Sequence, residues 1–401
     1  MKRTKINKRT KKFPAWPHYE ADEIEAVSKV LQSGKVNYWT GQECKLFEKE
    51  FADYIGMPYA ISLANGSLAL ELALYVYDIG VGDEVITTSR TFIASASAAV
   101  MRGATPIIAD IDHESGNITA ETIAQKISPR TKAIIVVHLA GWPAEMDEIM
   151  ALAKKHDIKV IEDVAQAHGA KYKGQMAGSI ADISAFSFCQ DKIISTGGEG
   201  GMLLLKDEAE FKKAWSYKDH GKGFDTVYHK KHPVGFRYLH DSFGTNWRMT
   251  EMQAAIGRAQ LKKLPKWLAE RKRNAAILTE RLSDIKALRI PRPPEYIEHA
   301  YYKYFLYVNL EQLQNRKTRT DISDGIFDRG VFCRVGSCSE IYLEQAFRES
   351  DFAVTEPLKI AQEFSETAMM LLVHPGLSEN DMHDMADVVE YVVGELAEGN
   401  E

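Results

Sequence analysis

Short apolar segments alternate with helical segments between residues 58 and 206, and this alternation constrains the fold more than any other feature. Short continuous apolar runs bounded by turn residues predict strands that are buried on both faces of a sheet. Helices between such strands return the chain across the sheet, so that neighbouring strands run parallel. We predict an α/β domain with a mostly parallel seven-stranded sheet, with strands at 59–64, 84–89, 105–111, 132–139, 159–164, 181–188 and 200–206.

The chain changes character after this region. Residues 217–245 are rich in His, Lys, Gly and Tyr and too irregular for a core element, and a loop of this length is usually functional or interfacial. A long helix is predicted at 250–282, bent at Pro265. Beyond the PRPP boundary at 291–294, residues 300–395 predict a smaller α+β domain.

We therefore expect three units. They are a basic arm at 1–15, a large domain at 16–260, and a small C-terminal domain with the linking helix at 261–401.

Composition excludes several classes of protein. The net charge of −6 gives no overall basic excess for nucleic acid, and no apolar run reaches the length of a membrane helix. The four cysteines are scattered, which fits reduced thiols in a cytoplasm, and their spacing does not match a zinc site. We expect a cytoplasmic protein with no nucleic-acid partner, no membrane segment and no metal site.

The first twelve residues carry seven Lys or Arg and no acid. No apolar segment follows them, so they do not form a signal peptide. Either they bind a polyanion or they are a solvated, disordered tail, and the tail is the favoured interpretation.

Lys192 and Asp163 form the most informative pair in the sequence. Lys192 follows an apolar strand and precedes the glycine-rich TGGEGG, and Asp163 ends an earlier apolar strand. Pyridoxal 5′-phosphate (PLP) requires a lysine for a Schiff base and a carboxylate for its pyridine nitrogen. Taken singly, each residue is equally well explained as a solvated side chain, but together they predict a PLP site.

Other residues near strand ends allow both a functional and a structural interpretation. Gly66 and Ser67 open a helix, where backbone N–H groups attract a phosphate, although Ser67 is also a good N-cap. Ser187 is suited to contact a phosphate oxygen or to fill a buried strand. Phe92 is suited to stack on a flat ring, although core packing is the default for a phenylalanine.

In combination, these motifs resemble the DegT/DnrJ/StrS family of PLP-dependent nucleotide-sugar aminotransferases, which have the aspartate-aminotransferase fold (fold type I). The resemblance extends from about Trp16 to the C-terminal helix. It rests on the order and spacing of GDEVI at 82–86, TFIASASA at 91–98, EDVAQAHGA at 162–170, FSFCQDK with GGEGG at 186–201, and GTNWRMTEMQAAIGRAQL at 244–261.

The resemblance implies a role for each matching position. Lys192 is expected to be the cofactor-linked lysine that also moves the substrate proton, and Asp163 the partner of the pyridine nitrogen. Gln166 is expected beside the phenolic oxygen, and Phe92 against the ring. The phosphate contacts implied are Gly66, Ser67, Ser187 and, from the neighbouring subunit, Asn246. His168 and Arg248 lie in the same motifs and are candidate substrate contacts.

The implied reaction takes the amino group of glutamate and gives it to a nucleotide-linked keto-sugar, with a uridine-linked 4-keto-6-deoxy-hexosamine as the leading expectation. The implied assembly is a homodimer with shared active sites. The sequence departs from the family in three places that are expected to contact substrate: the basic arm, the loop at 217–245, and the segment CRVGSCSEIYLE at 333–344.

Two alternatives stay open. The first is another fold-type-I PLP enzyme that acts on amino acids. A desulfurase would require a cysteine on a mobile loop, and 217–245 contains none. The second is a non-catalytic regulator of this fold, which would require a lost lysine or an attached DNA-binding module, whereas Lys192 is present.

Overall fold

A computed structural model describes residues 9, 11–232, 235 and 237–397 of the chain. Within these residues the largest sheet is seven-stranded, in the order β1-β9-β8-β5-β4-β2-β3. Strands β8, β5, β4, β2 and β3 pair in parallel, whereas β9 is antiparallel to both of its neighbours. The strands are β1 (Tyr59–Leu63), β2 (Glu84–Thr88), β3 (Thr105–Ala109), β4 (Thr131–Val137), β5 (Lys159–Asp163), β8 (Ile183–Ser187) and β9 (Gly201–Leu205). The predicted fold class is confirmed, and each predicted strand range overlaps one of these strands.

Helices cover both faces of this sheet, because its strands send alternate side chains to opposite sides. Ala185 and Leu203 pack into a core cluster with α3, whereas Phe186 and Met202 pack with α2 and the long helix α9 (Glu251–Leu282). The helices of this region are α1 (Ala21–Ser33), α2 (Glu43–Ile55), α3 (Gly66–Val76), α4 (Ala94–Met101), α5 (Ala120–Ala124), α6 (Met146–His156), α7 (Glu208–Lys218) and α8 (Phe224–Tyr228).

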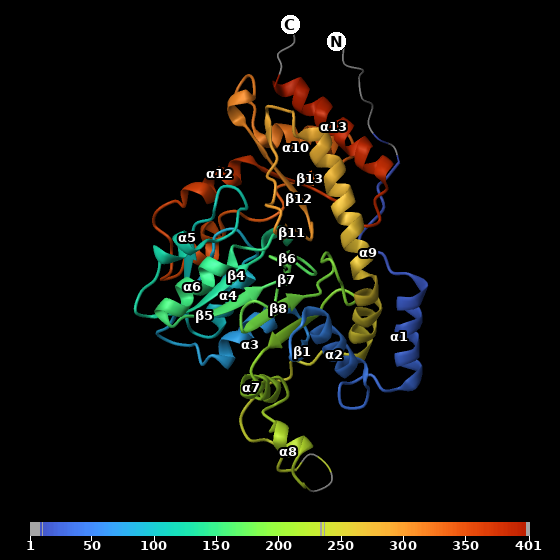
Figure 1. Ribbon diagram of the computed structural model, residues 1–401, viewed down its shortest axis with the longest axis vertical. Helices are drawn as coiled ribbons and strands as arrows, with labels where there is room; N and C mark the ends of the chain where they lie inside the picture. Colours follow the sequence, from blue (N-terminus) through green and yellow to red (C-terminus); the bar gives the residue numbers. More distant parts are fainter. Residues whose placement is uncertain (1–8, 10, 233–234, 236, 398–401) are drawn as a thin grey trace.

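Helix α9 (Glu251–Leu282) joins the two halves of the molecule (Figure 1). One part of it packs against α1 and α2, and its other part packs against α13 (Glu379–Ala397). Its N-cap is Thr250, whose side chain accepts from Gln253 N–H, and the helix runs without interruption through Pro265. The division of the chain at residues 15 and 260 stays a prediction.

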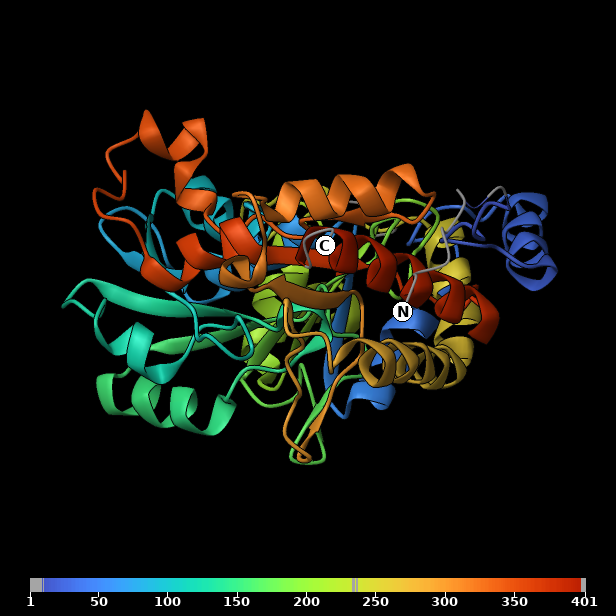
Figure 2. The ribbon, with the colours of Figure 1, turned by 90° about the horizontal axis from the view of Figure 1, so that it is seen from above.

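The second half contains a four-stranded antiparallel sheet in the order β10-β12-β14-β13. Figure 2 shows α10 and α13 side by side over this region, and both helices contribute to its apolar core. The elements are β10 (Leu288–Arg289), β12 (Tyr304–Val308), β13 (Cys333–Arg334), β14 (Ala368–Leu371), α10 (Arg319–Asp328), α11 (Gln345–Arg348) and α12 (Lys359–Thr367). A further small sheet pairs β11 (Ile297–Glu298) with β6 (Lys171–Tyr172) and β7 (Gln175–Met176).

Two expectations need correction. The stretch 217–245 is not uniformly peripheral: Lys218 and Asp219 are fully buried, and Asp219 accepts from Lys222 Nζ at 2.7 Å. Of the predicted basic tail, residues 1–8 and 10 lie outside the described part. Arg9 does not behave as a solvated residue, because its guanidinium pairs with Asp381.

Candidate active site

A cavity of about 940 Å³ opens beyond the carboxyl ends of β5 and β8, where ligands gather in open α/β sheets. Its wall combines residues of the large sheet with residues around β12 and β13. Seven of the residues expected to hold the cofactor line it: Gly66, Ser67, Phe92, Asp163, Gln166, Ser187 and Lys192. Segments far apart in the sequence therefore converge on one cavity, as the resemblance implied.

Asp163 lies at the end of β5 with 5% of its surface exposed. One carboxylate oxygen accepts from the Ser95 hydroxyl at 2.9 Å, and the other accepts from Ala165 N–H at 3.1 Å. Burial raises the pKa of this carboxyl above its ordinary value, although these bonds and the charge of Lys192 oppose the rise. A cation placed beside Asp163 in the cavity would relieve the cost of burying the charge.

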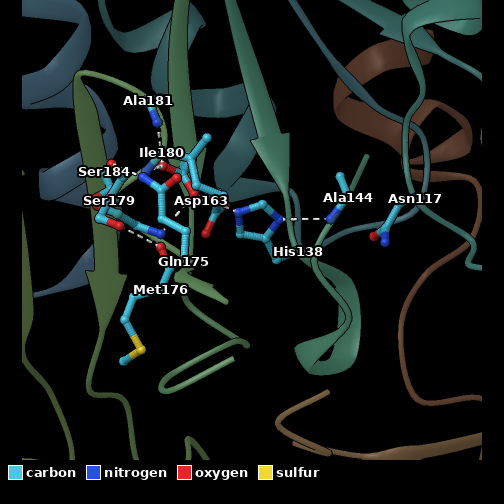
Figure 3. Close-up of polar contacts among 12 residues, drawn as sticks. Asn117, His138, Ala144, Asp163, Gln175, Met176, Ser179, Ile180, Ala181 and Ser184 are labelled. Carbon is cyan, nitrogen blue, oxygen red and sulfur yellow. Dashed lines mark hydrogen bonds and ion pairs between the residues drawn. The ribbon is translucent and has the colours of Figure 1, made fainter. Parts of the chain in front are cut away.

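Glu162 points to the opposite face of the sheet, as strand alternation requires. Its carboxylate is fully buried and accepts from His138 Nε2 at 3.0 Å. Ala144 N–H donates to Nδ1 of His138 at 3.1 Å, which fixes the ring as the Nε2–H tautomer (Figure 3). Three backbone N–H groups also donate to this carboxylate, those of Gly178, Ile180 and Ala181.

Lys192 lies in the loop between β8 and β9, and its N–H donates to Cys189 O at 3.0 Å. Its Nζ lies 4.9 Å from the ring centroid of Tyr302, a distance typical of cation–π attraction. The Tyr302 hydroxyl in turn donates to Asp191, whose carboxylate lies 3.5 Å from Lys303 Nζ. Burial alone would raise the pKa of Asp191, but these neighbours and Lys192 lower it on balance.

Sequence reasoning missed Tyr302 and Lys303. Both precede β12, more than a hundred residues after Lys192, so only the tertiary fold brings them to this cavity. The segment YKYFLYVNL predicts a strand, but it carries no signal for a contact with Lys192.

The start of α3 approaches β8 so closely that only glycine fits. A Cβ at Gly66 would lie 2.6 Å from the Cβ of Ser187. The N-cap of α3 is Asn65, whose side chain accepts from Leu68 N–H at 3.0 Å, so the interpretation of Ser67 as the cap is wrong. Ser67 instead lines the cavity in the first turn, where free N–H groups and the helix dipole favour a phosphate.

Gln166 and Phe92 present different groups to the cavity. Gln166 Oε1 accepts from Ala140 N–H at 2.9 Å, so the group it offers to a ligand is its Nε2 donor. The Phe92 side chain is 68% exposed, which excludes the core-packing interpretation and leaves its ring available for stacking.

Three further candidates lie outside the cavity lining. His168 is fully buried between Phe186 and Phe188, and burial with the nearby charge of Lys192 lowers its pKa to about 3. Its placement behind the strand does not fit the expected substrate contact. Arg248 donates to Asp219 at 2.7 Å. Asn246 is exposed, and its backbone pairs with that of Asp219 in an isolated antiparallel β-bridge.

Comparison with known proteins decides the family. The model of the DegT/DnrJ/EryC1/StrS aminotransferase family matches residues 17–390. The chain belongs to this family. The crystal structure of an aminotransferase from Psychrobacter cryohalolentis is 50% identical with a TM-score of 0.94, over 96% of this chain and 99% of that one.

Two relatives with assigned substrates are also similar over nearly their whole lengths. The GDP-perosamine synthase of Caulobacter vibrioides is 36% identical over 94% of this chain and 97% of its own. The UDP-N-acetyl-3-dehydro-alpha-D-glucosamine 3-aminotransferase of Acidithiobacillus ferrooxidans is 34% identical over 92% of this chain and 93% of its own.

As a member of the DegT/DnrJ/EryC1/StrS family, the chain is a PLP-dependent sugar aminotransferase of fold type I, and the expected cofactor is confirmed. The cavity fits this cofactor on its own geometry. It offers a lysine, a buried carboxylate whose two hydrogen bonds come from the neutral donors Ser95 and Ala165, and a glycine where a side chain would collide with Ser187.

The structure brings to the cavity part of the segment 333–344, which was expected to contact substrate. Five of its residues line the wall opposite the sheet: Gly336, Ser337, Cys338, Ile341 and Glu344.

No helix in the described part of the chain is long and apolar enough to cross a membrane.

Proposed function

We propose that this aminotransferase moves the amino group of glutamate to the keto carbon of a nucleotide-linked keto-sugar, with a UDP-linked 4-keto-6-deoxy-hexosamine as the first substrate to test. The observation that carries the proposal is the cavity itself. At about 940 Å³ it lies near the upper end of the range for small-molecule sites, so Lys192 and Asp163 at one end leave room for a second, larger ligand.

The residues of this chain would hold the cofactor as follows. Gly66 N–H, Ser67 and the Ser187 hydroxyl would bind its phosphate, with the dipole of α3 adding a favourable field. Asp163 would pair with the pyridine nitrogen and keep it protonated. Gln166 Nε2 would donate to the phenolic oxygen.

PLP supplies, when bound, an electron sink for the amino transfer. Lys192 Nζ would take up the proton removed from the donor carbon in the first half of the reaction and would supply a proton to the acceptor carbon in the second half. The ring of Tyr302 lies against Nζ. It would keep the amine close to the reacting atoms whenever Lys192 is not linked to the cofactor. Phe92 would cover the cofactor ring at the mouth of the cavity.

The proposal includes a homodimer with shared active sites and a cytoplasmic location. Asn246 supports the dimer, because it is exposed and absent from the lining of the cavity in its own chain. The four cysteines are free thiols, which supports a reducing compartment.

The test is an amination screen of UDP-, dTDP- and GDP-linked keto-sugars with glutamate as donor. We expect amino-sugar formation with at least one of them, and none with Lys192→Ala, which should also lose the cofactor trapped by borohydride. Activity confined to free amino acids and keto acids would instead favour an amino-acid enzyme of the same fold.

Shared sites have a separate test. Lys192→Ala and Asn246→Ala are each inactive if Asn246 serves the partner's cavity. Mixing the two under conditions of subunit exchange should then restore about a quarter of wild-type activity, because half of the dimers are hybrids with one intact site. A mixture that stays inactive would rule out complementation across the dimer.

A further inference from the structure

The chain before α1 runs from the small domain to the loop that carries Lys192, beside α13 and α9 (Figure 1). We call this segment, Arg9 together with residues 11–19, the N-terminal strap. At its first end Arg9 N–H donates to Arg329 O at 3.0 Å, and the Arg9 guanidinium pairs with Asp381 and Asp384. Phe13 packs against the apolar core of the small domain.

At its other end, the strap contacts the catalytic loop through two side chains. Trp16 Nε1 donates to the backbone carbonyl of Lys192 at 2.9 Å. The Tyr19 hydroxyl lies 3.2 Å from the Ser195 hydroxyl, within hydrogen-bond distance. These contacts hold the loop at Lys192, the residue that the proposed function makes catalytic, and three residues after it.

The Trp16 ring is itself fixed by its surroundings. Trp267 of α9 meets it edge-on with the ring centroids 5.0 Å apart, and His374 stacks on it at 5.9 Å. The Arg271 guanidinium lies 5.2 Å from its centroid. All three partners are almost completely buried, so they hold the indole ring in the orientation that points its N–H at the Lys192 carbonyl.

The loop that holds Lys192 contains no helix or strand between Cys189 and Gly200. A few hydrogen bonds within the loop, such as that from Lys192 N–H to Cys189 O, fix part of its backbone, and contacts from outside the loop fix the rest. Gln260 of α9 accepts from Ser195 N–H at 2.9 Å, and the bond from Trp16 fixes the peptide of Lys192 itself. A lysine that must return to one position after each transfer benefits from a peptide that cannot rotate.

We propose that Trp16 is a positioning residue for Lys192, and that the strap ties the Lys192 peptide to the small domain. The role assigned to Lys192 rests on the proposed function. The strap contacts, in contrast, are properties of the cofactor-free protein and can be measured without turnover.

The experiment is hydrogen exchange by mass spectrometry on the cofactor-free full-length protein and two tryptophan variants. Trp16→Phe keeps an aromatic ring against Trp267 and His374 but removes the N–H donor. Trp142→Phe is the control, because the Trp142 ring is buried against His299 and makes no hydrogen bond or ring contact with the residues described for the loop. We expect amides of 189–196 to exchange about fivefold to tenfold faster in Trp16→Phe, the loss of one hydrogen bond, and to be unchanged in Trp142→Phe.

A second readout separates positioning from general loosening. In the holoenzyme, Trp16→Phe should lower kcat about fivefold while the KM for the keto-sugar stays within twofold, because only the Lys192 peptide is released. Tyr19→Phe, which removes one hydroxyl, should raise exchange only near Ser195 and by a smaller factor. This milder variant also keeps the strap testable if Trp16→Phe folds poorly.

Unchanged exchange of 189–196 in Trp16→Phe would overturn the proposal, as would an equal rise in Trp142→Phe. Failure of the amination screen with a positive exchange result would remove the proposed substrate and leave the strap contact standing. The two proposals therefore fail separately.

Discussion

The two carboxylates at the end of β5, Glu162 and Asp163, are neighbours in sequence but serve opposite sides of the sheet. Glu162 accepts from four protein donors and does not line the cavity. Asp163 accepts from two and lines the cavity. Both are buried at 5% exposure or less, so burial alone does not distinguish them.

The difference lies in how much of each carboxylate the protein itself satisfies. A buried carboxylate surrounded by donors holds the fold together, because each N–H that it accepts would otherwise be unpaired. A buried carboxylate with open acceptor positions facing a cavity indicates a ligand that brings a proton or a positive charge. Four predictions test this contrast.

The largest effect is expected for Asp163→Asn, in activity. A neutral amide cannot stabilise the protonated pyridine nitrogen as a carboxylate does, so kcat/KM should fall by about 10³-fold. The Lys192 linkage should still form, and borohydride trapping of the cofactor provides that control. Activity within tenfold of the wild type would show that this pairing is dispensable.

Glu162→Gln should mainly reduce stability. The new NH₂ group would face N–H donors, so the free energy of unfolding should fall by about 3 kcal/mol in urea titrations. The control Glu298→Gln removes only an exposed ion pair with Lys171, so it should change the free energy of unfolding by less than about 0.5 kcal/mol. Equal effects of the two variants would contradict a structural role for Glu162.

Gly66→Ala tests the cavity side of this comparison, at the place where the cofactor phosphate is expected to bind. The added Cβ would lie 2.6 Å from the Cβ of Ser187, so we expect about 2 kcal/mol of destabilisation and weaker cofactor binding. Adding Ser187→Gly removes the colliding atom, and thermal melting of the double variant should recover most of the stability. No recovery would place the strain elsewhere.

The smallest effect concerns pH and the cofactor-free protein. The folded-state pKa of Asp163 is raised by burial above its ordinary 3.8, so the folded chain binds this proton more tightly than the unfolded chain. The associated stability is present below the unfolded pKa and is lost as pH rises through the folded pKa. Cofactor-free Asp163→Asn should therefore be more stable than the wild type at pH 7, by about 1 kcal/mol, and the advantage should vanish in acid. A variant that is less stable at both pH values would contradict this linkage.

Much of the fold could be predicted, because short apolar runs and helical spacing are local signals. They located all seven strands of the main sheet and the long helix α9, for which Thr250 is the N-cap. The direction of β9 is not a local property, since it depends on which strands it joins. The same limit explains why the burial of Lys218 and Asp219 could not be predicted from a polar stretch.

The site could be predicted in part for the same reason. Lys192, Asp163 and Gly66 belong to motifs with fixed spacing, and the structure brings all three to one cavity. Tyr302 and Trp16 reach Lys192 through contacts that span more than a hundred residues of sequence. His168 belongs to a matching motif, yet its side chain is packed between two phenylalanines, because a motif fixes the backbone path and not each side chain's direction.

The antiparallel pairing of β9 with β8 makes the Lys192 loop the connection of a hairpin, whereas Asp163 lies on β5, the parallel neighbour of β8. The two groups that PLP needs therefore come together only after β5, β8 and β9 have joined. Capture of the coloured cofactor during refolding should thus report the completion of this part of the sheet. The enzyme carries its own optical probe of assembly, which needs no added dye.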